Sequence, residues 1–331
     1  MADRIWPPGS ATGLGSLPGT DSAEAVKTVF GELPDLPHVP ELAARGPGAE
    51  MIGRSAGLLV DFPVEIQPSG WRVTSRAGGD LRHARDLLAR DLDALQQEAE
   101  QYSGALKVQV VGPWTLAASI ELRSGHRAVS DHGATRDLAE SLAAGLRAHL
   151  DDLQSRTPGA RLVVQFDEPS VRAVLAGEVQ TPSGYGTVPS IPPATVTETL
   201  AALLAVAPEG GRVVHCCDAN VPIALLRQAG ADGIALDAAL IADQEAIAEA
   251  VEGGVALWLG VVPATDASIS LDSAREPIQQ LWSQLGFAAD QLATAVVPTP
   301  VCGLASASAA YARRAMRIVR DLGRALRDES G

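Results

Sequence analysis

Two of the chain's three cysteines stand beside a histidine in the stretch RVVHCCDAN, residues 212–220. His215 and Cys217 are two positions apart, so in an extended strand their side chains point to the same side, and Cys216 points to the other. A histidine nitrogen and a thiolate can share a metal ion, but both also occur as ordinary core residues at a buried strand end. A redox pair is the third interpretation, although adjacent cysteines are poorly placed for the exchange that C-x-x-C motifs perform.

The third cysteine favours the metal interpretation. Cys302 lies in the stretch VVPTPVCGL, at the end of another apolar run. If the ends of the two runs meet, one nitrogen and two sulfurs form a ligand set that suits tetrahedral Zn²⁺. A fourth position then remains for a carboxylate, a water molecule or a substrate. Asp237, at the end of the run GIALD, is expected to be an oxygen ligand or a partner of the site, with a helix N-cap as the alternative.

Two neighbouring carboxylates, Asp167 and Glu168, end a further apolar run, RLVVQF. Because neighbours in a strand point to opposite sides, only one of the two should face the inside of the sheet. An inward carboxylate would supply a fixed negative charge for a cationic group of a substrate. The alternative is a carboxylate that caps the following helix.

All these residues follow short apolar runs that alternate with helical stretches. Eight runs predict strands, over residues 11–18, 56–63, 106–114, 161–169, 212–217, 232–239, 255–263 and 294–304. Helical periodicity of apolar residues covers 80–102, 135–154, 194–207, 221–230, 243–251, 273–285 and 305–328. The Pro/Gly-rich parts, 31–50 and 181–193, predict long loops.

This alternation indicates parallel β/α units. Eight units in one chain of 331 residues predict an α/β fold, a single (β/α)8 TIM barrel domain over residues 1–331. In such a barrel the chemistry lies at the carboxyl ends of the strands, where the cysteines and carboxylates stand. An open doubly wound sheet is the alternative, but no G-x-G-x-x-G motif follows the first strand.

Composition restricts the class of partner. A formal net charge of −14 argues against nucleic acid, which needs a concentrated basic surface. No apolar stretch approaches the ~20 residues of a membrane helix. The N-terminus has no basic segment followed by an apolar run, so we expect no signal peptide. A cytoplasmic protein with reduced thiols is therefore expected.

Six stretches together resemble the C-terminal catalytic domain of the cobalamin-independent methionine synthases, in a short form without the N-terminal half. They are GLGSLPGTD (13–21), VVGPWTL (110–116), VVQFDEPSVRAVL (163–175), VVHCCDAN (213–220), GADGIALDAAL (230–240) and PTPVCGLAS, which ends at residue 306. The stretches follow the family's order and span nearly the whole chain. The resemblance implies a zinc-containing barrel that transfers a methyl group to a thiol, most simply from a methyl donor to homocysteine to form methionine. Its metal ligands would be His215, Cys217, Cys302 and Asp237.

The resemblance also implies how the amino-acid substrate is held. Gly15 and Ser16 resemble the loop that binds the carboxylate of homocysteine, and Asp167 the residue that receives its ammonium group. Three departures from the family matter. Asp237 stands where the family has glutamate, and its side chain is shorter by one methylene, which bears on the metal site. The N-terminal half of the long form, which helps to support a folate, has no counterpart here, and LWLGVVPATDAS (257–268) lacks the family's histidine after strand seven, the proposed proton donor. The last two departures leave the methyl donor open between methyl-tetrahydrofolate and another compound. Alkylation of another small thiol, or a metal-binding barrel without this activity, are the alternatives.

Overall fold

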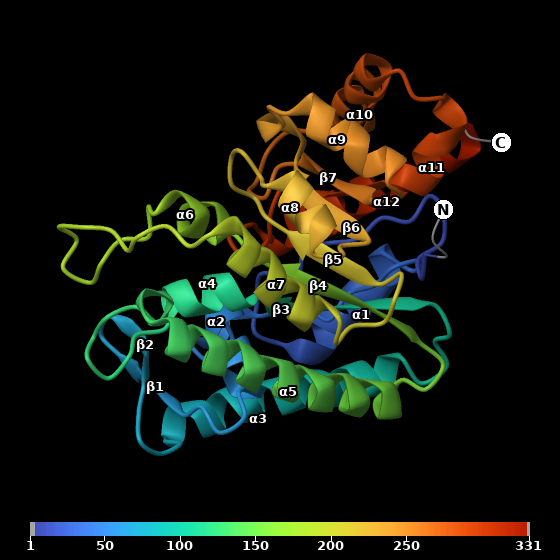
Figure 1. The fold of residues 1–331 in the computed structure, drawn as a ribbon. Helices are drawn as coiled ribbons and strands as arrows, with labels where there is room; N and C mark the ends of the chain where they lie inside the picture. Colours follow the sequence, from blue (N-terminus) through green and yellow to red (C-terminus); the bar gives the residue numbers. More distant parts are fainter. Residues whose placement is uncertain (1–3, 330–331) are drawn as a thin grey trace.

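The computed structural model describes residues 4–329, which form an α/β fold around one parallel sheet (Figure 1). Six strands pair in chain order: β3 (Ala105–Val111), β4 (Arg161–Asp167), β5 (Arg212–His215), β6 (Gly233–Asp237), β7 (Ala256–Val262) and β8 (Val296–Pro300). Every neighbouring pair is parallel. The predicted α/β fold and these six strands are therefore confirmed.

Helices connect the strands and cover the outside of the sheet. Those between the strands are α4 (Pro113–Ser119), α5 (His132–Arg156), α6 (Val171–Ala176), α7 (Pro193–Leu204), α8 (Ile223–Gln228), α9 (Gln244–Glu252), α10 (Leu271–Leu285) and the short α11 (Leu292–Ala295). The chain ends with α12 (Ala309–Glu329), whose buried side chains recur every three or four residues. No helix within residues 4–329 has the length and apolar character needed to cross a bilayer.

The N-terminal part contains α1 (Ser22–Glu32), α2 (Met51–Leu58), a hairpin of β1 (Val64–Gln67) and β2 (Gly70–Val73), and α3 (Gly79–Glu98). The prediction of a strand over 56–63 is wrong, because this run begins inside α2 and continues into the turn after it. The Glu50 side chain accepts hydrogen bonds from the backbone N–H groups of Ile52 and Gly53 and thereby caps α2. The apolar run is thus partly the buried face of a short helix.

The predicted strand over 11–18 is an extended segment without regular strand pairing. Ser16 forms an isolated parallel bridge with Glu41, and His38 forms another with Lys107 of β3. On the other side, the backbone N–H of Thr12 donates to the Pro298 carbonyl of β8 at 3.4 Å. The expectation of eight strands is therefore confirmed only for six of them, while two extended segments lie along the edges of the sheet.

The inward-facing side chains of the strands form layers. An apolar cluster, separate from the larger core under the helices, contains Trp6, Leu14, Leu36, Ala105, Val163, Val213, Ala235, Ala256, Trp258 and Val297. Because residues two apart on a strand share a side, the same faces continue to Lys107, Gln165 and His215. Apolar packing thus supports a polar layer at the carboxyl ends of the strands.

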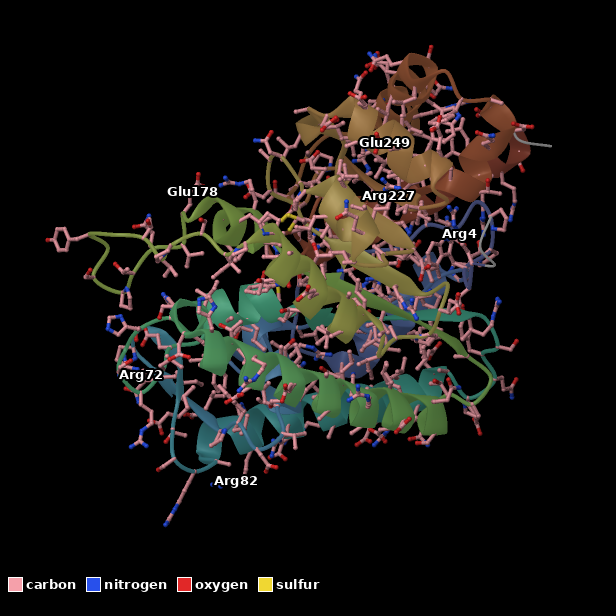
Figure 2. The ribbon with its side chains drawn as sticks, in the orientation of Figure 1. Arg4, Arg72, Arg82, Glu178, Arg227 and Glu249 are labelled. Atoms are coloured by element: carbon pink, nitrogen blue, oxygen red, sulfur yellow. The ribbon has the colours of Figure 1, made fainter. Side chains whose placement is uncertain are left out.

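Most charged side chains lie outside this core (Figure 2). Arg227 of α8, for example, pairs with Glu249 of α9 at 3.3 Å on the surface. Buried ionisable groups are therefore exceptional, and three of them, Lys107, Asp167 and His215, belong to β3, β4 and β5.

Candidate metal and substrate site

Three metal-ligating side chains meet at the carboxyl ends of β5 and β8. The ligand atoms of His215, Cys217 and Cys302 all lie within 4.8 Å of one another, and the two sulfur atoms are 3.9 Å apart. His215 is buried, and both cysteines are partly buried. The three residues singled out in the sequence are thus brought close enough to hold one ion. One nitrogen and two sulfurs match the donors that Zn²⁺ prefers.

His215 has one nitrogen engaged and one left over. Its Nδ1 atom lies 2.7 Å from Asp167 Oδ1, whereas Nε2 is buried and has no hydrogen-bond partner within the described residues. An unsatisfied buried polar atom costs about 1–3 kcal/mol. A carboxylate that binds the far nitrogen of a histidine is the usual support of a metal-bound imidazole. The orphaned Nε2 therefore fits a metal ligand.

The two partly buried thiols influence each other's ionisation. Their contact lowers the pKa of Cys302 to about 6, and it raises the pKa of Cys217. When the two sulfurs share one proton, Cys302 loses its proton more readily than a free thiol does, and Cys217 keeps the shared proton. Cys216 lies on the opposite side, fully buried in the outer apolar core, where burial raises the pKa of its thiol to about 11. Cys216 thus points away from His215 and Cys217, as predicted, and packs in this core.

Asp167 and Glu168 point to opposite sides of β4, as expected for neighbours in a strand. Asp167 is buried and accepts a hydrogen bond from Gln165 Nε2 at 2.7 Å. Glu168 accepts from the backbone N–H groups of Trp114 and Thr115 at 2.9 and 2.8 Å. It therefore caps α4, which precedes β4 in the chain, and not the helix that follows. Burial raises the pKa of Glu168 to about 7.

The Gly15–Ser16 segment lies directly against the loop that carries Cys302. Gly15 has φ +124, and a side chain there would collide with Gln109. The Leu304 N–H donates to the Ser16 carbonyl at 2.8 Å. A methyl group on Gly303 would collide with Ser16 Oγ, so the two loops are in close contact. The predicted substrate loop and the cysteine ligand are thus neighbours.

A further buried carboxylate, Glu41, was not predicted from the sequence. Its N–H donates to the Gly15 carbonyl at 3.1 Å, and burial raises its pKa to about 7. The Arg54 guanidinium, 3.8 Å away, acts in the opposite direction, and the charge of Asp167 adds to the increase. The only local signal was a lone acidic residue after His38 and Val39, within a Pro/Gly-rich stretch predicted as a loop.

Asp237 is not brought into the group of His215, Cys217 and Cys302 within the described residues. Its side chain accepts from the Ala239 N–H at 2.9 Å and caps a short 3₁₀ helix, Ala238–Leu240. The structure thus contains the N-cap that was the alternative, and the role of Asp237 at the metal stays a prediction.

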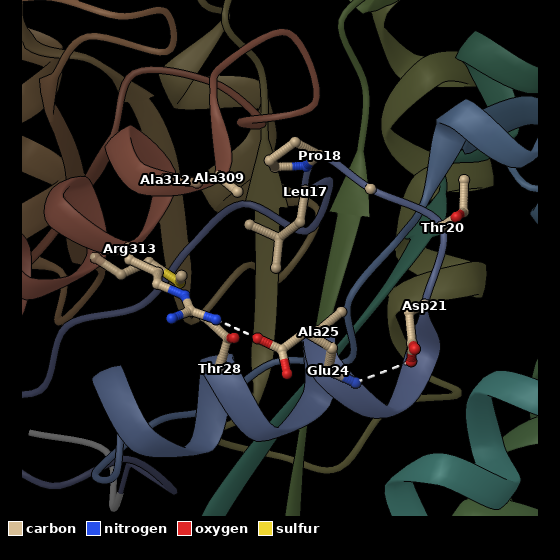
Figure 3. Close-up of a pocket in the computed structure, with 12 residues that line it drawn as sticks. Leu17, Pro18, Thr20, Asp21, Glu24, Ala25, Thr28, Ala309, Ala312 and Arg313 are labelled. Carbon is tan, nitrogen blue, oxygen red and sulfur yellow. Dashed lines mark hydrogen bonds and ion pairs between the residues drawn. The ribbon is translucent and has the colours of Figure 1, made fainter.

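A groove begins one residue beyond Ser16, between α1 and α12 (Figure 3). Its cavity volume is about 200 Å³, and Leu17, Pro18 and Ala312 contribute to its apolar lining. Arg313 of α12 pairs with Glu24 of α1 across it. The groove lies next to the substrate loop and is separate from the polar interior.

Fold and site together define an α/β protein with a soft metal-ligand set at the carboxyl ends of parallel strands. The family model described as "Cobalamin-independent synthase, Catalytic domain" matches residues 10–325. The chain therefore belongs to this family, and the resemblance seen in the sequence is confirmed.

Two solved structures share the fold. A B12-independent methionine synthase from Shewanella sp. W3-18-1, in complex with selenomethionine, has a TM-score of 0.65 at 13% identity, with 97% of this chain and 98% of that chain covered. A methyltransferase from Methanosarcina mazei has a TM-score of 0.59 at 12% identity, with 99% and 95% covered. No curated protein matches the chain by sequence.

Proposed function

We propose that the protein is a zinc-dependent methyltransferase that forms methionine from homocysteine and a methyl donor. The observation that carries this proposal is the orphaned Nε2 of His215 beside the thiols of Cys217 and Cys302, in a member of the cobalamin-independent synthase family. The Shewanella methionine synthase was solved with selenomethionine. Methionine is the product that the proposed reaction releases.

We infer that the sheet closes into an eight-stranded barrel forming one domain over residues 1–331. Segments 12–17 and 38–41 would serve as its first two strands. Hydrogen bonds join segment 12–17 to β8 and to Glu41, and the Val39 N–H donates to the Lys107 carbonyl of β3 at 2.9 Å. Short irregular pairing at these two positions leaves the carboxyl ends of all the strands around one opening.

In this proposal His215 Nε2 and the sulfurs of Cys217 and Cys302 hold Zn²⁺, and Asp237 or the substrate sulfur completes the shell. When bound, Zn²⁺ would supply the positive charge that favours the thiolate form of a substrate thiol near neutral pH. Asp167 fixes the imidazole by its bond to Nδ1. Together these residues would hold the attacking sulfur in one place, which lowers the entropic part of the barrier.

The residues around Ser16 would recognise the amino-acid part of homocysteine. The backbone at Gly15 and Ser16 would bind the carboxylate, and Asp167 with Glu41 would bind the ammonium group. Two buried carboxylates repel each other, which is visible in the pKa of Glu41, raised in part by Asp167. A bound ammonium group would relieve this repulsion.

Two classes of methyl donor fit the proposal. One is methyl-tetrahydrofolate, and the other is a compound with a better leaving group or a donor delivered by a partner protein. Transfer from a tertiary amine requires a proton at the leaving nitrogen. Segment 257–268, which covers most of β7 and the residues that follow it, has no histidine, and its Asp266 accepts two hydrogen bonds from Ser308 before α12. This segment therefore favours a donor whose leaving group needs no proton.

Metal analysis of the wild type, Cys302→Ala and Cys216→Ala tests the site. We expect about one zinc per chain in the wild type and in Cys216→Ala, which loses a thiol from the opposite side of the strand, and little in Cys302→Ala. Negligible zinc in all three proteins would refute the site.

Turnover tests the activity. Zinc-loaded protein should transfer a methyl group from one of the donor classes to homocysteine, and homocysteine should perturb the spectrum of the cobalt-substituted protein. If the protein prefers another small thiol, that thiol replaces homocysteine as the proposed methyl acceptor. If the protein binds zinc stoichiometrically but transfers no methyl group from any donor, the remaining interpretation is a metal-binding barrel without this activity.

A further inference from the structure

Four buried polar side chains form a chain of hydrogen bonds along the inward faces of β3, β4 and β5. Lys107 Nζ donates to Gln165 Oε1 at 2.6 Å, and Gln165 Nε2 donates to Asp167 Oδ1 at 2.7 Å. His215 Nδ1 lies 2.7 Å from the same Asp167 oxygen. None of the four residues is more than 6% exposed, so bulk water does not compete for these bonds.

The chemistry of Lys107 fixes the direction of the bonds. A lysine amine offers N–H groups, so the Gln165 atom that faces it is the amide oxygen. The amide nitrogen then faces two acceptors, Asp167 Oδ1 and, at 3.0 Å, the Leu14 carbonyl. The reverse orientation of the amide would place its oxygen against two oxygens and would leave Lys107 facing an NH2 group.

The contact between Asp167 and His215 also has a defined donor and acceptor. Asp167 Oδ1 accepts a hydrogen bond from Gln165 and lies 2.7 Å from His215 Nδ1. Because a carboxylate oxygen accepts hydrogen bonds, His215 Nδ1 is the donor in the second contact. The proton of the neutral imidazole therefore resides on Nδ1. The lone pair is then on Nε2, the nitrogen that has no partner within the described residues.

We propose that Lys107 and Gln165 are positioning residues that set the tautomer of His215 through Asp167. The consequence for zinc rests on the proposed function, but the tautomer exists in the metal-free protein as well. With the proton on Nε2, His215 could not bind an ion until it changed tautomer and lost its bond to Asp167. The chain thus prepares the nitrogen ligand before the ion arrives.

Gln165 also connects the metal side to the substrate side. Its second acceptor is the carbonyl of Leu14, the residue before Gly15 and Ser16. One amide group thus holds both the support of His215 and the loop proposed to bind the substrate carboxylate. Loss of Gln165 should therefore weaken zinc binding and raise the KM for homocysteine together.

The test compares the wild type with Gln165→Met, which keeps the length of the side chain but has no amide. The matched control is Thr299→Val, which removes from β8 a buried hydroxyl that has no hydrogen-bond partner among residues 4–329. Long-range ¹H–¹⁵N spectra of metal-free protein at pH 8 report the tautomer of His215, assigned by comparison with His215→Ala. Competition with a chromophoric chelator reports the zinc affinity.

We expect the Nδ1–H tautomer in the wild type and in Thr299→Val, and a substantial Nε2–H population in Gln165→Met. Zinc affinity should fall about 10–100-fold in Gln165→Met only, the usual effect of losing a partner behind a ligand. An unchanged tautomer in folded Gln165→Met overturns the inference, whether or not zinc binds.

Lys107→Met is the second variant, for the case that Gln165→Met does not fold. It keeps the amide but removes the donor that orients it, so the Nε2–H population should rise here too, and no rise overturns the inference. If the wild type shows Nδ1–H but binds no zinc, the proposed function fails and the positioning role stands.

Discussion

We predict that the buried histidine His149 lowers the free energy of unfolding in mild acid. It lies on α5 and is 6% exposed. Burial, together with the positive charge of Arg54 on α2, lowers the pKa of His149 to about 4, and Asp152 on the same helix acts in the opposite direction. The unfolded chain therefore takes up a proton, with a pKa near 6.5, before the folded protein does. The stability from neutral His149 is complete above pH ~6.5 and is lost as the pH falls towards 4.

The magnitude follows from these two pKa values. Their difference, about 2.5 units, corresponds to about 3 kcal/mol once the pH is below both. Between pH ~7.5 and ~5, His149 accounts for a decrease of about 2 kcal/mol in the free energy of unfolding. Other groups titrate over the same interval, so the informative quantity is the difference between the wild type and His149→Gln.

Urea unfolding of metal-free protein at the two pH values measures this difference. His149→Gln should lose about 2 kcal/mol less than the wild type between pH ~7.5 and ~5. His83→Gln is the matched control, because His83 is exposed on α3 and its replacement should leave the pH dependence unchanged. Equal losses in the wild type and His149→Gln would refute the reasoning.

Three further predictions follow from the interior of the fold. Glu168→Ala removes the carboxylate that caps α4 and should lower the free energy of unfolding by about 2–4 kcal/mol, measured in urea; a loss below ~0.5 kcal/mol would contradict the cap. Gly303→Ala places a methyl group against Ser16 and should raise the KM for homocysteine several-fold with the zinc content unchanged; an unaltered KM would speak against the contact of these loops. Asp91→Ala removes the closer of the two ion-pair partners of the buried Arg54 guanidinium and should cost about 3–5 kcal/mol in thermal or urea unfolding; a neutral effect would show that Glu41 or water replaces Asp91.

The regular part of the fold was predictable because its signals are local. Six strands and the longer helices carry apolar periodicity within single segments, and that periodicity follows from which face is buried. The strand predicted over 56–63 failed because a short apolar run is compatible with either structure. The deciding feature was Glu50, whose side chain caps α2 several residues earlier.

The candidate site was only partly predictable. His215, Cys217 and Cys302 were recognisable because sulfur and imidazole at strand ends are uncommon in a chain with three cysteines. Glu41 and Lys107 carried no such signal, since one lies in an irregular stretch and the other inside an apolar strand. Their importance depends on burial beside Asp167, a property of the assembled interior.

By itself the sequence determined the parallel β/α architecture, the family and the three candidate metal ligands, because each depends on residue types at fixed spacing. The tertiary structure alone decided which atoms can act together. It placed Cys302 3.9 Å from Cys217 and turned Nδ1 of His215 to Asp167. These outcomes depend on contacts between distant segments, whose geometry is set by the packing of the whole sheet.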